Sequence, residues 1–358
     1  MPPRRYLPVR PVLFGLLIGV AVLLSACGAE LPATTLDPKG THAQRIYDLL
    51  IPIFWTALGV FVVVEGLLIY SVLRFRQKPG AAIPAQIHGN TRIEILWTLA
   101  PALILLVIAV LTFRTQALQS VRPADALHIK VIGHQWWWEF QYPGLGPNGS
   151  PLVTANDLYI PVGRDVTLEL TGADVIHSFW VPRLAGKTDA IPSKTNSLSF
   201  KAEQEGIYRG LCAEFCGEEH ALMRFRVIAV APETFQRWAQ QLATPPPPPT
   251  DQAAARGQQI FLSSQKACIG CHAIAGTTAA GVLGPNLTYF GSRETIAAGT
   301  LENTPENLKR WLHNPGAVKP GNLMSTVIKE GTLSEQEIND LVAYLESMRI
   351  DIPKPAEN

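Results

Sequence analysis

The sequence of 358 residues predicts a multidomain chain with a two-helix transmembrane hairpin, an all-β domain and an all-α domain. Two long apolar segments, 49–73 and 95–113, are each long enough to cross a bilayer as a helix. Residues 124–232 instead show short strands with alternating apolar and polar residues, separated by turn-forming clusters. A linker with five prolines, 244–250, precedes residues 251–350, where helical patterns return.

Composition excludes some classes of partner and of scaffold. The hydrophobic fraction of 47% suits a mixture of membrane and soluble parts, and a net charge of +1 gives no reason to expect a nucleic-acid partner. Of the five cysteines, Cys27 stands alone, and Cys212 pairs in sequence with Cys216 as Cys268 does with Cys271. Each therefore has its own assignment, and none is left over for a structural disulfide framework.

Residues 1–26 are predicted to be an export signal of the lipoprotein type. Three arginines lie within the first ten residues, and the apolar run 12–24 is too short to span a bilayer comfortably. The following Leu-Ser-Ala-Cys resembles a bacterial lipobox, which implies that Cys27 becomes the lipidated N-terminus. The alternative is an ordinary signal peptide with an incidental cysteine at position 27.

The predicted hairpin, residues 45–115, carries two acidic residues of interest. Glu65 interrupts the first apolar segment, where an ionised carboxylate is costly, so we expect it to face a helix of another subunit. A protonated acid without a role is the alternative. Glu94 precedes the second segment, where a carboxylate at a helix N-terminus is favoured by the helix dipole.

A stretch of twelve residues gathers soft metal ligands. It contains Cys212, Cys216, His220 and Met223, and thiolates, imidazoles and thioethers suit copper. Two cysteines four residues apart can both bridge a pair of copper ions. A disulfide or a Cys2His2 zinc site would use some of the same residues, but neither explains the methionine three residues after the histidine.

Two further groups complete the candidate copper ligands. His177, which lies upstream, would give each copper ion its own imidazole. Met223 would be a weak ligand on one ion, and the Glu214 backbone carbonyl would serve the other. The arrangement, including the 35-residue gap between His177 and Cys212, resembles the binuclear CuA centre of cytochrome c oxidase subunit II. The resemblance implies that residues 124–232 form a cupredoxin-like Greek-key barrel.

The same family resemblance assigns roles outside the copper ligands. Three consecutive tryptophans begin at Trp136, which matches the family residue that lies over CuA and admits electrons; a purely structural role is the alternative. Glu94 matches a residue at the mouth of a proton path into subunit I. The side chain of Glu214 matches a residue that helps to bind magnesium at the boundary with subunit I.

The sequence Cys268-Ile-Gly-Cys271-His272 is the signature of covalent haem c, with two thioether anchors and a proximal imidazole. Taken alone, the motif also occurs in zinc sites and redox dithiols. Met324 lies in a Pro/Gly loop, which suits a sixth ligand that must be aimed at iron.

Two other side chains compete for the sixth position. Met348 continues the apolar stripe of the last helix and is predicted to be core, and His313 sits beside a proline at a helix end. We therefore choose Met324. This domain resembles class I cytochrome c, and its fusion behind a CuA domain resembles subunit II of caa-type oxidases.

The resemblance implies the electron-input subunit of a respiratory cytochrome c oxidase. Electrons would come from cytochrome c or a reductase and pass through haem c and CuA to the haem-copper centre of subunit I, where oxygen is reduced and protons are translocated. Alternatives are a similar subunit of a nitric oxide reductase, or a free-standing membrane electron carrier. We expect a multi-pass protein of the bacterial cell membrane that binds subunit I and other membrane subunits, with its soluble domains on the outer side.

Overall fold

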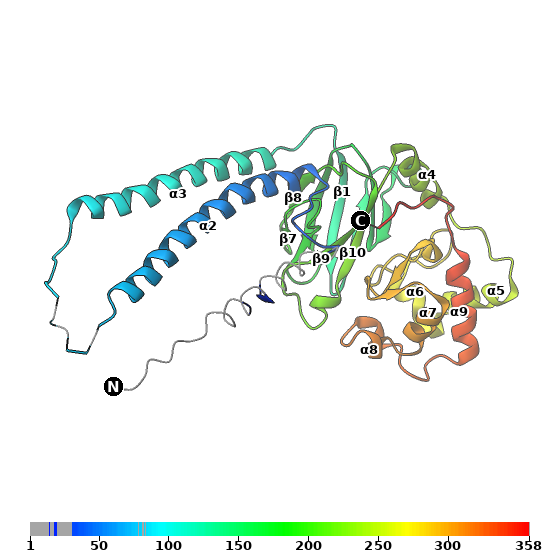
Figure 1. Ribbon diagram of the computed structural model, residues 1–358. Helices are drawn as coiled ribbons and strands as arrows, with labels where there is room; N and C mark the ends of the chain where they lie inside the picture. Colours follow the sequence, from blue (N-terminus) through cyan, green and yellow to red (C-terminus); the bar gives the residue numbers. More distant parts are fainter. Residues whose placement is uncertain are drawn as a thin grey trace.

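The computed structural model describes residues 14, 18–19, 31–77, 79–80, 82 and 84–357. Cys27 and the end of the predicted export signal lie outside the described residues. Three parts follow one another along the chain: a long helical hairpin, a β-sandwich and a small helical domain beside the sandwich (Figure 1).

The hairpin consists of α2 (Thr41–Arg74) and α3 (Thr91–Gln119), and the turn that joins them lies at the end far from the sandwich (Figure 1). Both helices are long and apolar enough to cross a membrane. They run past the predicted segments 49–73 and 95–113 at both ends, since polar residues continue each helix beyond its apolar part. The side chain of Asn90 caps α3 by accepting from the amides of the first turn.

The sandwich contains two five-stranded sheets with the orders β3-β2-β1-β5-β8 and β4-β10-β9-β6-β7. The pairs β1–β5 and β10–β4 are parallel, and the other pairs are antiparallel. Burial alternates along β1 and along part of β5, whereas β4 and most of β10 are buried on both faces, and the inner faces of the two sheets pack together. The strands are β1 (Leu127–His134), β2 (Trp137–Tyr142), β3 (Leu152–Ala155), β4 (Asp157–Pro161), β5 (Val166–Gly172), β6 (His177–Trp180), β7 (Thr188–Ala190), β8 (Asn196–Phe200), β9 (Gly206–Cys212) and β10 (Arg224–Val230).

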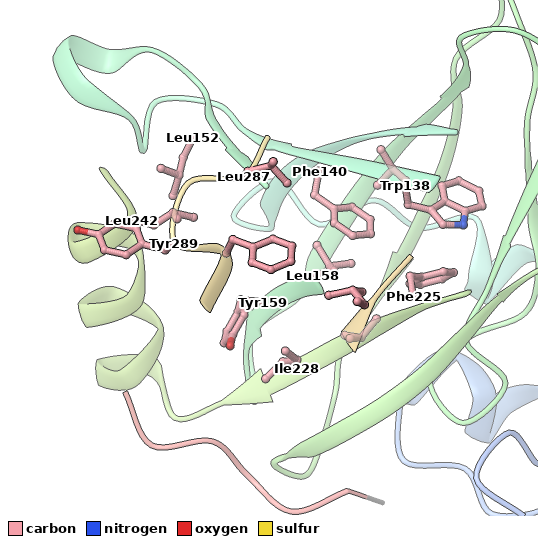
Figure 2. Packing of buried hydrophobic residues seen from close by; sticks show 14 of the residues in the cluster. Trp138, Phe140, Leu152, Leu158, Tyr159, Phe225, Ile228, Leu242, Leu287 and Tyr289 are labelled. Carbon is pink, nitrogen blue, oxygen red and sulfur yellow. The ribbon is translucent and has the colours of Figure 1, made fainter. Parts of the chain in front are cut away.

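Aromatic side chains fill the sandwich core, part of which is shown in Figure 2. Trp138 is fully buried and makes edge contacts with Phe179 and Phe225, at ring-centroid distances of 5.6 and 5.5 Å. It also contacts the ring of His177 edge-on at 5.9 Å. Truncating such a residue costs roughly 3–5 kcal/mol of folding free energy. Because Trp138 packs against both His177 and Phe179, the core holds β6, the strand that carries His177, in place.

The helical domain follows α4 (Pro232–Ala243) and the proline linker. Its longest helices, α5 (Gln252–Leu262) and α9 (Glu335–Ser347), cross where Gly257 meets the backbone of Asp340; a Cβ at Gly257 would lie 1.9 Å from the Asp340 carbonyl oxygen. Only glycine permits this approach. The shorter elements are α6 (Cys268–Cys271), η5 (Phe290–Ser292), β11 (Thr295–Ile296), β12 (Leu301–Glu302), α7 (Pro305–His313), α8 (Pro315–Val318) and η6 (Leu323–Thr326).

The helical domain docks against the sandwich. One cluster of buried hydrophobic residues continues from the sandwich into it and includes Leu287 and Tyr289 (Figure 2). Arg226 of β10 is buried, pairs with Asp157 at 3.0 Å, and reaches Glu294 of the helical domain at 2.6 Å. An arginine held by two carboxylates in this way ties the two domains together.

The C-terminal segment returns to the sandwich (Figure 1). The amide of Ile207 donates to the carbonyl of Ala356 at 3.0 Å, and Glu357 forms an ion pair with Arg209 of β9 at 3.2 Å. This segment therefore adds a short parallel bridge beside β9. The helical domain is thus joined to the sandwich through the linker at one end and through this segment at the other.

Candidate metal centre and haem cavity

The predicted copper ligands meet at one end of the second sheet. His177 opens β6 and Cys212 closes β9, while the loop that follows carries Cys216 and leads into η3 (His220–Leu222). The loop is pinned at its base, because the amide of Cys212 donates to the carbonyl of Met223 at 3.1 Å. Ligands from three backbone segments are thereby brought to a single point.

The sulfur and nitrogen atoms lie within metal-bridging reach of one another. The two thiol sulfurs are 3.8 Å apart, so they are not joined by a disulfide, whose bond is about 2.0 Å. Cys212 Sγ lies 3.9 Å from His177 Nδ1, and Cys216 Sγ lies 3.7 Å from His220 Nδ1. Met223 Sδ is 3.8 Å from Cys216 Sγ. Each thiol therefore has an imidazole of its own.

The backbone adds a further donor. The carbonyl oxygen of Glu214 lies 3.4 Å from Cys212 Sγ, whereas the Glu214 side chain is exposed. Two thiols, two imidazoles, a thioether and a carbonyl exceed the four ligands of a structural zinc site. This donor set instead suits two soft ions that share the sulfurs.

The two neighbouring thiols shift each other's pKa in opposite directions. The hydrogen bond from Cys216 lowers the pKa of Cys212 to about 3, with a smaller effect from His177. The resulting thiolate, together with burial, raises the pKa of Cys216. Binding of cations would remove this conflict, because both sulfurs could then carry negative charge.

Asp174 orients His177. The ring nitrogen Nε2 of His177 lies 2.8 Å from Asp174 Oδ1, which leaves Nδ1 facing Cys212. Burial lowers the pKa of His177, but hydrogen bonds to Asp174 and Cys212 outweigh burial and raise it overall. Gly133 is required beside the ring, since a Cβ there would lie 2.7 Å from His177 Cδ2.

Trp136 contacts the copper-ligand loop directly. Its indole Nε1 donates to the carbonyl of Cys216 at 3.0 Å, and the side chain of Gln135 donates to the same carbonyl at 2.8 Å. Trp137 and Trp138 are buried, whereas Trp136 is half-buried at the interface with the helical domain. The first tryptophan of the run thus differs in position from the two that follow it.

The haem signature opens onto a cavity of about 180 Å³. Cys268, Cys271, His272 and Met324 all line it. The Nδ1 of His272 bonds to the carbonyl of Pro285 at 2.8 Å, which leaves Nε2 free for iron. A metal-ligating histidine commonly has such a partner.

Other residues of the domain also fit a haem. Arg293 lines the cavity and forms no ion pair with an acidic side chain in the part of the chain that the structure describes; burial lowers its pKa to about 10. A haem propionate would supply the missing negative charge. Neither Met348, which is buried in the core, nor His313, which is half-exposed and 3.9 Å from Glu330, lines the cavity.

Glu94 lies far from both sites, in the first turn of α3 at the end of the hairpin opposite the sandwich (Figure 1). Its Oε1 accepts from the backbone amide of Asn90 at 3.0 Å, and the side chain is exposed. The carboxylate therefore caps the helix. Glu65 is exposed on the surface of α2.

Several residues at the sites were not identified from the sequence. Asp174 had a weak signal, since it precedes a ligand histidine by three residues. Lys319 and Glu219 form a buried ion pair across the domain interface and had no local signal. Arg293 resembled any surface arginine in sequence.

Three family comparisons match most of the chain. Residues 12–115 match the transmembrane domain of cytochrome C oxidase subunit II, 147–230 its periplasmic domain, and 254–349 cytochrome c. The chain is 40% identical over 338 residues to cytochrome c oxidase subunit 2 of Alkalihalophilus pseudofirmus, covering 92% of this chain and 95% of that protein. The chain belongs to the cytochrome c oxidase subunit II family.

Two further relatives are similar. Cytochrome c oxidase subunit 2 of Bacillus sp. (strain PS3) is 36% identical over 359 residues, with 95% of this chain and 98% of that protein covered. The crystal structure of the periplasmic domain of subunit II of cytochrome oxidase of Bradyrhizobium japonicum is 32% identical and covers 34% of this chain and 96% of that chain, with a TM-score of 0.32.

The predicted fold class and function are confirmed. As a member of the subunit II family with a fused cytochrome c domain, the protein is the electron-input subunit of a respiratory oxidase, an oxidoreductase. It is a membrane protein that associates with subunit I. The family implies CuA copper and haem c, and the donor atoms described above fit both groups.

Proposed function

We propose that the copper pair is held by two bridging thiolates, two imidazoles, one thioether and one backbone carbonyl. The observation that carries this proposal is the separation of 3.8 Å between the two sulfurs, each with its own imidazole. Asp174 positions the first imidazole, and the pinned loop positions the second. The ligands are His177, Cys212, Glu214 (carbonyl), Cys216, His220 and Met223.

We propose that Cys268 and Cys271 anchor the haem and that His272 and Met324 are its axial ligands. Support comes from the shared cavity and from the bond between His272 and Pro285, which orients the imidazole. When bound, the copper pair and the haem each accept and release single electrons. The protein's part is to fix ligand geometry and to exclude water from both sites.

Electron paramagnetic resonance of the purified oxidase tests the copper assignment. Two bridging thiolates let equivalent copper ions share one unpaired electron, so we expect the hyperfine pattern of two copper nuclei. The variant Cys216→Ser should lose this pattern and keep the haem spectrum. A pattern from a single copper nucleus in the wild type would contradict the binuclear assignment.

Trp136 is proposed to be the point at which electrons enter the copper site. The support is its hydrogen bond to the carbonyl of Cys216, a ligand residue, together with its position beside the helical domain. An aromatic side chain that lies against both the copper-ligand loop and the Met324 loop offers a route between the two sites.

Two acidic residues are proposed to act at the boundary with subunit I, one in proton transfer and one in magnesium binding. Glu94 is proposed to lie at a proton path into that subunit, and its exposed carboxylate at the far end of the hairpin is available to a partner. The exposed side chain of Glu214 is proposed to bind magnesium, with subunit I supplying the remaining ligands. Oxygen reduction in subunit I would then be coupled to proton translocation.

We propose that the chain is exported and anchored in a bacterial cell membrane. Residues 1–26 would direct export and Cys27 would be lipidated. The domains at 124–232 and 251–350 would lie on the outer side of a bacterial cell membrane, on either side of the linker 244–250. There the haem domain would receive electrons from cytochrome c or a reductase.

A further inference from the structure

Lys319 is a buried cation that joins the haem domain to the copper domain. It lies in the loop between α8 and η6 that also leads to Met324. Its side chain is 4% exposed, and its Nζ donates to the backbone carbonyl of Trp136 at 2.9 Å. The same Nζ lies 3.0 Å from Glu219, whose side chain is 1% exposed.

This ion pair forms only when the domains are docked. Each partner comes from a different domain, and a buried charge without its partner is strongly unfavourable. Burial lowers the pKa of Lys319, and Glu219 offsets part of that effect. Glu219 is next in sequence to His220, so the pair connects the loop of one proposed axial ligand with the loop of a proposed copper ligand.

Two glycines bring the same loops onto the indole of Trp136. Gly217, in the copper-ligand loop, and Gly321, in the Met324 loop, have φ angles of +118° and +85°. A Cβ at Gly217 would lie 3.0 Å from Trp136 Cζ2, and a Cβ at Gly321 would lie 3.6 Å from Trp136 Cη2. The ring thus lies beside both loops. The missing Cβ allows its close approach at Gly217, whereas 3.6 Å at Gly321 is an ordinary contact distance.

We propose that Lys319 is a positioning residue that aligns the Met324 loop with Trp136 and, through it, with the copper-ligand loop. The proposal rests on the proposed function, since the alignment matters only if both cofactors bind. A second ion pair between the domains, Arg226–Glu294, involves none of the residues proposed to contact copper or haem. It holds the domains together, whereas Lys319 sets their local register at the site.

The proposed alignment would affect the transfer of one electron from the haem to the copper pair. Ferrous haem becomes ferric, the oxidised copper pair is reduced by one electron, and no proton is exchanged. Electron transfer between two groups slows as their separation grows and the path between them is lengthened, so loss of the alignment should slow this transfer while both cofactors stay bound.

The test uses the complete purified oxidase and the variant Lys319→Met, which keeps most of the aliphatic stem. Electron transfer from photoreduced haem to copper should be several-fold slower. Hydrogen exchange should become faster at residues 134–137 and 319–324. The copper resonance spectrum and the methionine–iron band should stay unchanged. Lys309→Met, which removes an exposed lysine from the same domain, should change none of these quantities.

A second variant separates alignment from simple neutralisation of Glu219, and it replaces the first if Lys319→Met fails to fold. Lys319→Met/Glu219→Gln removes both charges, so that no buried carboxylate is left unpaired. If the bond from Lys319 to Trp136 matters, transfer stays slow and exchange stays fast in this double variant. Recovery of wild-type transfer and exchange would overturn the proposal, as would a normal rate in a folded Lys319→Met.

Failure of the proposed function would look different. A wild-type oxidase that lacked the two-copper spectrum or covalent haem would refute the ligand assignments themselves. Intact spectra in the wild type and in Lys319→Met, with equal transfer rates and equal exchange, would refute only the role of Lys319.

Discussion

Asp174 holds His177 by a bond of 2.8 Å to Nε2, and it also accepts the backbone amides of Gln135 and Val175. These bonds fix the carboxylate, which in turn fixes the imidazole with Nδ1 toward Cys212. The arrangement is that of a metal ligand whose second nitrogen is oriented by a carboxylate. A change of one functional group at position 174 should therefore alter the orientation of His177 and the affinity of the site for copper.

The variant Asp174→Asn should weaken copper binding about 10- to 100-fold, because an amide holds the imidazole tautomer less well than a carboxylate does. Copper titration of the metal-free protein measures the change. Asp125→Asn, at an exposed aspartate before β1, is the matched control and should bind copper normally. Equal affinity in both variants would show that Asp174 does not orient the ligand.

Met324→His should keep covalent haem but lose the absorption band of methionine–iron ligation. The reduction potential should fall by on the order of 100 mV, within the roughly 0.8 V range that axial ligands span, because imidazole favours ferric iron more than a thioether does. Visible spectroscopy and redox titration measure both effects. Met348→Leu should change neither and should cost less than about 1.5 kcal/mol of stability. Loss of the band in the Met348 variant instead would reverse the assignment.

At the scale of elements, β10 and the segment before β11 hold the two domains together through Arg226 and Glu294. Burial raises the pKa of Glu294, but Lys354 and Arg226 outweigh it and bring the pKa below its ordinary value of 4.5. When the domains separate, Glu294 loses its contact with Arg226, and its pKa rises part of the way back towards 4.5. Ionised Glu294 therefore favours docking, and its contribution is complete above pH 4.5.

Docking should weaken as the pH falls from 4.5 through the lowered pKa of Glu294. The contribution should be below about 1 kcal/mol, since the Glu294 side chain is 39% exposed. Hydrogen exchange at the domain interface, followed against pH, measures it. Glu294→Gln should lack this component while keeping any other pH dependence. Identical pH profiles for the two proteins would show that the ion pair does not contribute.

At the scale of the whole molecule, two long apolar helices anchor the chain independently of its N-terminus. Cys27→Ala should abolish lipidation and leave the oxidase in the membrane, because a spanning helix holds far more strongly than acyl chains do. Mass spectrometry of the mature N-terminus and membrane fractionation measure the two effects. A wild-type mature chain that begins at another residue, without lipid, would contradict the lipobox interpretation.

The architecture could be predicted from the sequence, and so could the candidate ligands that the structure brings together, because the signals for both are local. Five of the six predicted copper ligands lie in the stretch from Cys212 to Met223, and the predicted haem anchors lie within five residues. The bond between Lys319 and Trp136 spans 183 residues and crosses a domain boundary. Neither periodicity nor motif spacing predicts a contact between residues so far apart in sequence. The pairing of Arg226 with Glu294 could not be predicted for the same reason.

The proline linker makes docking of the haem domain an intramolecular event. A tether of this length supplies an effective concentration on the order of millimolar. An interface with a dissociation constant of about 1 mM, too weak to hold separate proteins together, would then be occupied about half of the time. A haem domain cut free of its linker and C-terminal segment would have to be supplied at roughly millimolar concentration to deliver electrons as well as the tethered one does.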